Sequence, residues 1–373
     1  MAHAYTPGLK VTSKMTQRVV RMLPIKGEVF VKVGDTVTAD KIIAATYMPG
    51  DVLPLNMAHI LSVPPKDVAE LMLHQEGDAV KEGEPLAQTA GIFGKFKKIH
   101  NSPYTGTLET VSDVTGQVII RGPDIAVEVK AYMSGKIVEV NPEIGCTVEN
   151  STAFVQGIFG IGGETFGNLR FAVSACEQTL VAENITTDMK NCIVIGGARM
   201  TVEAIEAARS CGVAAIVSGG MDDQDLRDFL GYDLGVAITG SEKKGITVIL
   251  TEGFGDIAMA KRTFELLKSF EGHEASVNGA TQIRAGVMRP EIIIPLDAGD
   301  TGVEPQHTGG FLELGRPLRI IRDPYFGMIG TVKALPSDPH VLDSGSKARV
   351  LEVELSSGES VIVPRANVEL IEA

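Results

Sequence analysis

Glycines follow several short apolar runs in the middle of the chain, and this placement is suited to binding an anion. Gly196 and Gly197 come directly after one run and open a helical pattern, and Gly219 and Gly220 follow the next run. Where a strand ends and a helix begins, glycine lets backbone N–H groups approach an anion at the helix N-terminus. The sequence therefore predicts an anion site at these turns, although tight strand-to-helix turns also need glycine for structural reasons.

Three arginines could complete such a site. Arg199 lies in the first glycine turn, and Arg284 and Arg289 lie in a later segment. A guanidinium group can clamp a carboxylate or a phosphate through two parallel hydrogen bonds. Arg284 and Arg289 could equally pair with acidic side chains of the same region, namely Glu252, Asp256 or Glu291.

The sequence lacks the signatures of several other chemistries. Neither GxGxxG nor a P-loop follows any apolar run, so dinucleotide and nucleotide binding lack their usual residues. The four cysteines form no CxxC pair and the seven histidines show no HExxH spacing, which argues against a zinc or redox centre. A Gly-x-Ser-x-Gly elbow is also missing. We expect no metal and no cofactor. The missing signatures favour a protein without catalytic activity but leave an enzyme as an open alternative.

The elements that would position the glycine turns form an α/β unit. Short β-branched runs suited to buried strands occur at Arg170–Ser174, Cys192–Ile195, Ala214–Val217, Gly235–Ile238, Thr247–Leu250 and Glu291–Pro295. Helical patterns lie between several of them, at Thr201–Cys211 and at Asp256–Phe270, where Asp256 is the expected N-cap. This alternation predicts a mainly parallel sheet covered on both faces.

The C-terminal region has the residue pattern of a small β domain. Leu318–Val332 combines a short apolar strand, a turn at Pro324–Gly327, and Gly330, where a close backbone approach is expected. Farther on, Ala348–Leu355 alternates apolar and polar residues, and Ser360–Val363 follows a hairpin turn. The first of these segments resembles the KOW motif. That resemblance implies a five-stranded SH3-like barrel that binds RNA or protein.

The N-terminal half repeats one turn pattern. Short β-prone runs surround a glycine-centred turn in three segments, Gly27–Ala44, Gly77–Ala87 and Gly135–Val148. Val33–Val37 and Glu76–Gly83 come closest to a V-x-x-G-D-x-V-x-x-G pattern. These segments resemble half-units of the biotinyl/lipoyl family and of its relative, the barrel-sandwich hybrid. The resemblance implies a domain of paired β-hairpins.

A carrier domain of that family needs an exposed lysine at a hairpin tip. The resemblance puts Asp124 at one tip and Lys95 at the other. Asp124 cannot be modified, and Lys95 lacks the flanking Met or Asp of the family. Lys95 is therefore the one carrier candidate, and a basic solvated loop is the alternative interpretation.

The first 22 residues carry basic side chains and no acidic one. These basic residues are Lys10, Lys14, Arg18 and Arg21. Together with Arg319 and Arg322 of the KOW-like segment, they are the candidates for contact with a nucleic acid. The net charge of −13 opposes nonspecific attraction to a phosphate backbone, so such a contact would be local. A solubilising or partner-docking arm is the alternative.

A chain of 373 residues is too long for one compact core, so several domains are expected. We expect a basic arm (1–17), a barrel-sandwich-hybrid-like β domain (18–165), an α/β domain (166–300), a linker (301–315) and a KOW/SH3-like barrel (316–373). Because no apolar run approaches the length that crosses a bilayer, we expect a cytoplasmic protein without membrane contact.

Three functions fit these observations. The first is a non-catalytic scaffold or assembly protein that contacts other chains, copies of itself included, through its β-rich modules. The second is a KOW-type RNA- or ribosome-associated factor. The third is an enzyme or accessory subunit that binds a small anion. Residues 315–373 carry seven basic and eight acidic side chains, and this near-neutral balance favours protein partners over RNA.

Overall fold

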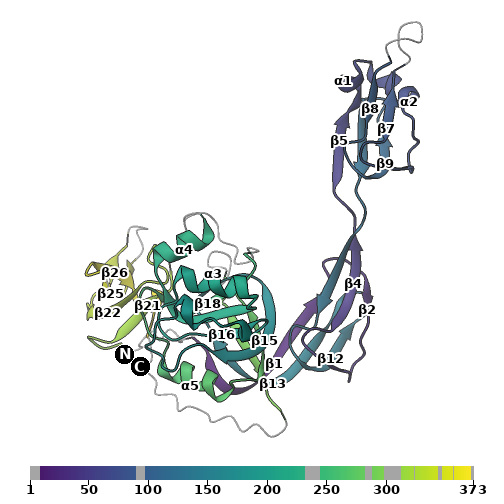
Figure 1. Ribbon diagram of the computed structural model, residues 1–373. Coiled ribbons are helices and arrows are strands. Elements are labelled where there is room, and N and C mark those ends of the chain that lie inside the picture. Colours follow the sequence, from purple (N-terminus) through teal and green to yellow (C-terminus); the bar gives the residue numbers. More distant parts are fainter. Residues whose placement is uncertain are drawn as a thin grey trace.

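The computed structural model describes residues 9–89, 97–231, 244–281, 288–297, 312–322, 324–342, 347–355 and 357–370. Figure 1 shows a body formed by the central and C-terminal strands, from which the N-terminal strands extend as an elongated arm. Hydrophobic cores lie in the body, at two places along the arm, and in the C-terminal module. The predicted class, an α/β unit combined with β modules, is confirmed.

The central sheet is mixed. Its parallel strands, in spatial order, are β18 (Thr247–Phe254), β17 (Ala215–Met221), β16 (Ile193–Ile195) and β15 (Glu164–Phe171). Antiparallel strands extend both sides: β14 (Phe159–Ile161) next to β18, and β19 (Glu274–Asn278) and β20 (Glu291–Pro295) beyond β15. Both faces of the parallel strands are covered, and every residue of β17 is buried. Strands buried on both faces favour the β-branched apolar residues found here. The parallel strands were predicted, but the antiparallel ones make the sheet mixed rather than mainly parallel.

Helices cover both faces of this sheet (Figure 1). They are α3 (Val202–Cys211) and α4 (Asp223–Leu230) on one face and α5 (Lys261–Ser269) on the other. Two short 3₁₀ turns, η2 (Ala182–Asn184) and η3 (Thr187–Met189), precede β16. Helix α3 begins where the sequence predicted, because the Thr201 hydroxyl accepts a hydrogen bond from the N–H of Ala204 at 3.2 Å.

The start of α5 differs from the prediction. The helix begins at Lys261, so the expected N-cap at Asp256 is wrong. The Glu252 carboxylate on β18 instead accepts a hydrogen bond from the N–H of Ala260 at 3.0 Å. A cap supplied by a neighbouring strand depends on tertiary packing, and no local pattern encodes it.

Two long strands join the body to the arm. β1 (Val11–Met22) and β13 (Gly145–Gln156) are each 12 residues long and pair along their length in antiparallel register. β13 also pairs with β20 in the body and with β12 (Gly135–Asn141) in the arm. These shared strands make one continuous sheet of the body and the base of the arm (Figure 1).

The arm contains two modules, one nested in the other. The proximal module adds β2 (Glu28–Val29), β3 (Thr36–Val37), β4 (Ile42–Met48) and β11 (Ile125–Lys130) to the long strands. The distal module lies between β4 and β11 in the sequence. Its elements are β5 (Val52–Asn56), α1 (Met57–Leu61), η1 (Pro65–Asp67), α2 (Val68–Leu71), β6 (Ala79–Val80), β7 (Pro85–Gln88), β8 (Ile99–Asn101), β9 (Gly106–Val111) and β10 (Gln117–Arg121). The chain therefore enters and leaves the distal module through adjacent strands.

The repeated Gly-Asp pattern has the same local cause in both modules. Gly34 and Gly77 adopt left-handed backbone angles, with φ of 98° and 95°. The carboxylates that follow them accept hydrogen bonds from backbone N–H groups three residues earlier, Asp35 from Lys32 at 2.8 Å and Asp78 from Gln75 at 2.7 Å. Each repeat is therefore a side-chain-stabilised turn.

The neck between the two modules is narrow. A Cβ on Gly50 would lie 2.4 Å from the carbonyl oxygens of Gly122 and Pro123. The N–H of Gly122 donates to the carbonyl oxygen of Asp51 at 2.8 Å. Glycine at position 50 is thus required by the close approach of the two chain segments.

The C-terminal module is a five-stranded antiparallel sheet. Its strands, in spatial order, are β26 (Ser360–Pro364), β25 (Val350–Leu355), β22 (Ile329–Ala334), β21 (Pro317–Ile320) and β27 (Val368–Leu370). The hairpin of β23 (His340–Val341) with β24 (Lys347–Ala348) and the turn η4 (Arg365–Asn367) complete it. The close approach expected at Gly330 is confirmed, since a Cβ there would lie 2.5 Å from the carbonyl oxygen of Glu354.

Candidate functional site

The glycine turns after β16 and β17 are packed against neighbouring backbone. A Cβ on Gly197 would lie 2.4 Å from the carbonyl oxygen of Ala175. The N–H groups of Gly196, Gly219 and Gly220 all donate to carbonyl oxygens of the same turns and strands. Close chain contacts therefore account for these glycines, and an anion at the turns would need other donors.

The arginines proposed for this site lie apart. Arg199 forms an ion pair with Asp222, the residue that precedes α4. Arg289 lies next to β20 and is directed toward the C-terminal module, where it pairs with Glu369 rather than with the acidic residues considered from the sequence. Arg284 lies outside the described residues, as does the carrier candidate Lys95.

A buried ionic network joins the C-terminal module to the body. The Glu369 carboxylate on β27 is 2% exposed, and it accepts hydrogen bonds from Arg289 at 2.7 and 3.1 Å and from Arg319 at 3.2 Å. Arg319, on β21, also donates to the backbone carbonyls of Thr251 and Glu252 at 2.9 Å and lies 3.4 Å from the Glu252 carboxylate. Two arginines and two glutamates from both parts thus pair with one another in a buried interface.

Backbone contacts continue this interface. The N–H of Phe254, at the end of β18, donates to the carbonyl oxygen of Gly327 at 3.0 Å. A Cβ on Gly253 would lie 2.5 Å from the same oxygen. In α/β sheets the carboxyl ends of parallel strands are the usual place for ligands. Here the C-terminal module covers the carboxyl end of β18.

The residues proposed for nucleic-acid contact lie in different places. Arg319 is 4% exposed and engaged in the buried network, so its guanidinium group does not reach the surface. Arg322 is exposed in the C-terminal module. Lys14, Arg18 and Arg21 lie on β1, one of the long strands that join body and arm.

The β1 cations differ in their engagement. Arg18 pairs with Glu149 across the β1–β13 ladder at 2.6 Å, and Arg21 is held by Glu164. The Lys10 ammonium lies 5.8 Å from the centroid of the Phe154 ring, just before the strand. Arg18 and Arg21 are three residues apart on a regular strand and so point to opposite faces of β1. The basic residues therefore do not gather with Arg322 into one patch.

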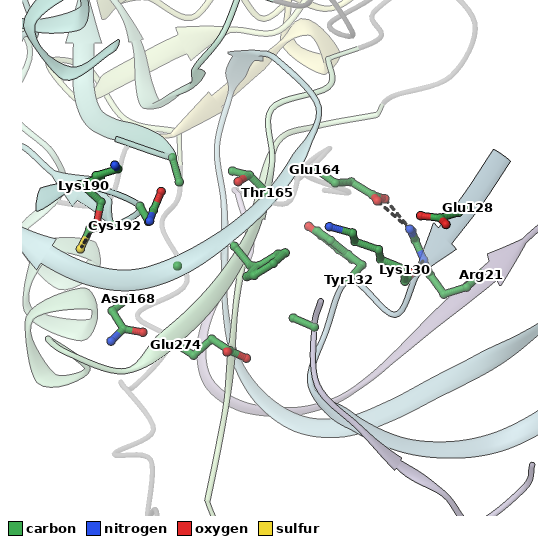
Figure 2. Close-up of a pocket in the computed structure, with 15 residues that line it drawn as sticks. Arg21, Glu128, Lys130, Tyr132, Glu164, Thr165, Asn168, Lys190, Cys192 and Glu274 are labelled. Carbon is green, nitrogen blue, oxygen red and sulfur yellow. Dashed lines mark hydrogen bonds and ion pairs between the residues drawn. The ribbon is translucent and has the colours of Figure 1, made fainter. Parts of the chain in front are cut away.

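A cleft of about 920 Å³ lies where the arm meets the body (Figure 2). Figure 2 shows Arg21, Glu128, Lys130 and Tyr132 on its arm side, and Asn168, Lys190 and Cys192 on its body side, with Glu164, Thr165 and Glu274 between them. On the body side the cleft opens at the amino ends of β15, β16 and β17, the end opposite to the predicted anion site. The lining residues come from segments far apart in the chain, so no spacing in the sequence could have indicated them.

Three contacts hold the arm against the body at this cleft. Arg21 donates two hydrogen bonds to the Glu164 carboxylate at 2.6 and 2.7 Å. The Ser134 hydroxyl donates to Glu274 at 2.6 Å, and the Tyr132 hydroxyl donates to Glu291 at 3.2 Å. In each contact a glutamate of the central sheet receives a donor from the arm.

Tyr132 has an unusual backbone conformation for a bulky residue, with φ of 68°. Its side chain is buried, and its N–H donates to the carbonyl oxygen of Ala39 at 3.0 Å. The Arg21 guanidinium lies 5.4 Å from the ring centroid. Surrounding contacts thus hold a strained residue at the junction of arm and body.

The Glu291 carboxyl group lies half-buried behind the cleft. Burial raises the pKa of Glu291, and the nearby charge of Glu164 raises it further, while the hydrogen bond from Tyr132 acts in the opposite direction. Burial also raises the pKa of Tyr132. Tyr132 therefore stays protonated and remains a donor at neutral pH.

The described residues contain no group of three or more His, Cys, Asp or Glu side chains arranged to hold a metal ion. The four cysteines form no disulfide bond. Within the part of the chain that the structure describes, no helix is both long and apolar enough to span a membrane. No family model and no curated protein sequence matches this chain.

Proposed function

We propose that this protein is a non-catalytic scaffold whose β modules hold other protein chains, copies of itself included. The observation that carries the proposal is the arm, which holds the distal module away from the body on a narrow neck (Figure 1). Such a shape leaves several strand edges and faces accessible to partners. An arm of this kind is suited to bridging between molecules.

Exposed apolar side chains at the neck support the proposal. Tyr47 is 69% exposed and Ile125 51%, and Met48 and Val52 are exposed beside them. Exposed apolar patches on soluble proteins often mark sites of protein contact. The neck is therefore the first place to look for a partner.

The resemblances of the modules agree with this function. The five antiparallel strands of the C-terminal module suit the KOW-like, SH3-like barrel that its sequence resembles, and the arm modules suit barrel-sandwich-hybrid-like folds. Domains of these kinds serve as binding modules. A cytoplasmic setting is part of the proposal, and four cysteines without disulfide bonds are compatible with it.

An RNA-associated role is the alternative, and the exposed cations Lys14, Arg18 and Arg322 favour it. Because Arg319 is buried, this role would depend on separate cations rather than on one basic surface. A salt-dependent interaction that nuclease abolishes would identify it.

The test is cross-linking mass spectrometry on the full-length protein in cells, combined with mass photometry before and after nuclease treatment. We expect nuclease-resistant complexes in which cross-links to other chains concentrate on arm lysines such as Lys26, Lys66 and Lys81. Single copies without cross-links between chains would contradict the scaffold, and complexes lost on nuclease treatment would favour the RNA role.

A further inference from the structure

The ribbon formed by β4 and β11 below the neck has an open edge. The three-stranded sheet has the order β11-β4-β2, so β4 is the one partner strand of β11 among the described residues. Two-stranded ribbons are only marginally stable in water and gain from a further strand. The outer edge of β11 is therefore available for strand addition.

The direction of the backbone groups on β11 follows from the ladder. The N–H of Phe30 donates to the carbonyl oxygen of Ile43, so alternate residues of β4, beginning with Ile43, direct their backbone groups toward β2. Thr46 directs its groups toward β11, where it pairs with Val127. The backbone groups of Ala126 and Glu128 consequently face outward from the edge.

The sequence of this edge is complementary to itself in antiparallel register. About a two-fold axis at Val127, Ile125 of one copy lies opposite Val129 of the other, and Val127 opposite its own equivalent. On the other face, Asp124 of each copy lies opposite Lys130 of the other, so the two-fold axis produces two such charge pairs. Apolar residues thus meet apolar residues and opposite charges meet, both of which stabilise antiparallel strand pairs.

The surroundings of the edge fit an added strand. Ile125 and its ladder partner Met48 are exposed, and Asp124 and Lys130 are exposed at the two ends. The cleft of about 920 Å³ lies beside Glu128 and Lys130 (Figure 2). At Lys130 the open edge ends, because the Arg21 guanidinium donates to its carbonyl oxygen at 2.8 Å.

The other long edge, that of β1, differs from the β11 edge in its bulge and its cationic side chains, although Val20 and Met22 are exposed on it as well. Among the described residues β1 pairs with β13 alone, and its ladder has a register shift between Thr12 and Met15, at the end of the strand nearest the body. Its exposed face carries Lys14 and Arg18. A bulge and cationic side chains are features by which edge strands avoid association. The ladder of β11 with β4 is regular from Ile125 to Val129, with a register shift only between Val129 and Lys130, and β11 carries one acidic and one basic side chain.

We propose that two copies of this chain associate by antiparallel pairing of β11 with β11 about Val127, which joins the two ribbons into one continuous sheet. The ladder hydrogen bonds run between Ala126 of each copy and Glu128 of the other. The proposal rests on the scaffold function and names the partner and surface for its self-association. The contact is small, so we expect a dimer that depends on protein concentration.

The test is sedimentation velocity of the full-length protein over a series of concentrations, with Asp124→Lys and Lys130→Asp as separate variants. Each variant places like charges opposite each other twice, and we expect each to weaken dimerisation by about tenfold or more. In a heterodimer of the two variants, both charge pairs are attractive again. We therefore expect an equimolar mixture of the variants to dimerise at the protein concentrations at which the wild type does. Asp113→Lys, a charge change on an exposed turn of the distal module, is the matched control and should leave dimerisation unchanged.

Several results would overturn the pairing. A wild-type protein that stays a single chain over the whole series would do so, as would variants that dimerise normally or a mixture that fails to recover. None of these results bears on cross-links between the arm and other proteins. The scaffold function is therefore tested separately, by the cross-linking experiment.

Discussion

Replacement of Glu369 by alanine should detach the C-terminal module from the body. The substitution removes three hydrogen bonds, those to Arg289 at 2.7 and 3.1 Å and that to Arg319 at 3.2 Å. It also leaves two guanidinium groups in a buried interface with one carboxylate, that of Glu252, which lies 3.4 Å from Arg319. Losing one partner of a buried ion pair costs about 3–5 kcal/mol, and we expect about 3–4 kcal/mol because Arg319 keeps a partner.

Hydrogen exchange followed by mass spectrometry measures the loss of stability in the C-terminal module itself. We expect amides of β21 and β25 to exchange about 100- to 700-fold faster in the variant, since each 1.4 kcal/mol is tenfold. The matched control is Glu352→Ala in the same module, which breaks the more exposed pair with Lys333 at 3.0 Å. That change should cost less than about 1 kcal/mol.

Equal acceleration of exchange in Glu369→Ala and Glu352→Ala would contradict this role of Glu369. In that case the buried network would contribute no more than a surface pair, and apolar packing alone would hold the module. Glu369→Gln keeps the shape and one acceptor without the charge, so its effect should lie between those of the wild type and the alanine variant.

Three further outcomes are expected. Gly197→Ala should lower the free energy of unfolding by about 1–3 kcal/mol in a urea titration, because its Cβ would collide with a carbonyl oxygen, while Gly163→Ala, where a Cβ meets open space, should change it by less than about 1 kcal/mol. Gly50→Ala should force the two segments of the neck apart and change the particle dimensions in small-angle X-ray scattering; an unchanged profile would contradict the assigned neck contact. Glu291→Gln tests the raised pKa. A raised pKa in the folded state means that the protonated form stabilises the fold fully below the unfolded value of about 4.3, and that this stabilisation is lost as pH rises through the folded value. The wild type should therefore lose stability relative to Glu291→Gln as the pH is raised from 4 to 7, and parallel pH profiles would contradict the shift.

Local patterns predicted several elements of the central sheet, although Gly235–Ile238 lies outside the described residues and the run at Arg170–Ser174 overlaps only the end of β15. The β-branched runs at β16, β17 and β18 and the helix after Thr201 occur as expected, because burial on both faces and a capping hydroxyl are recorded in adjacent residues. The N-terminus of α5 was predicted wrongly, since its cap comes from Glu252 on another strand. Patterns fail where a distant residue supplies the deciding contact.

The candidate sites were harder to predict. Arg289 was a candidate for binding a carboxylate or a phosphate and Arg319 for contacting a nucleic acid, and both pair with the carboxylate of Glu369 of the same chain. The cleft was missed because Arg21, Lys130 and Lys190 have no regular spacing. The sequence shows which side chains can bind an anion and does not show which of them are already engaged.

The sequence by itself determined the turns, the strand and helix segments, and the separate β character of the two ends, because these depend on backbone angles and on apolar periodicity over a few residues. It also contains the charge pattern from Asp124 to Lys130. Only the tertiary structure decided that one β module is nested in another, that Arg319 is buried, and that β11 pairs with β4 alone among the described residues. Those properties depend on contacts between residues far apart in the chain, and local residue patterns do not specify them.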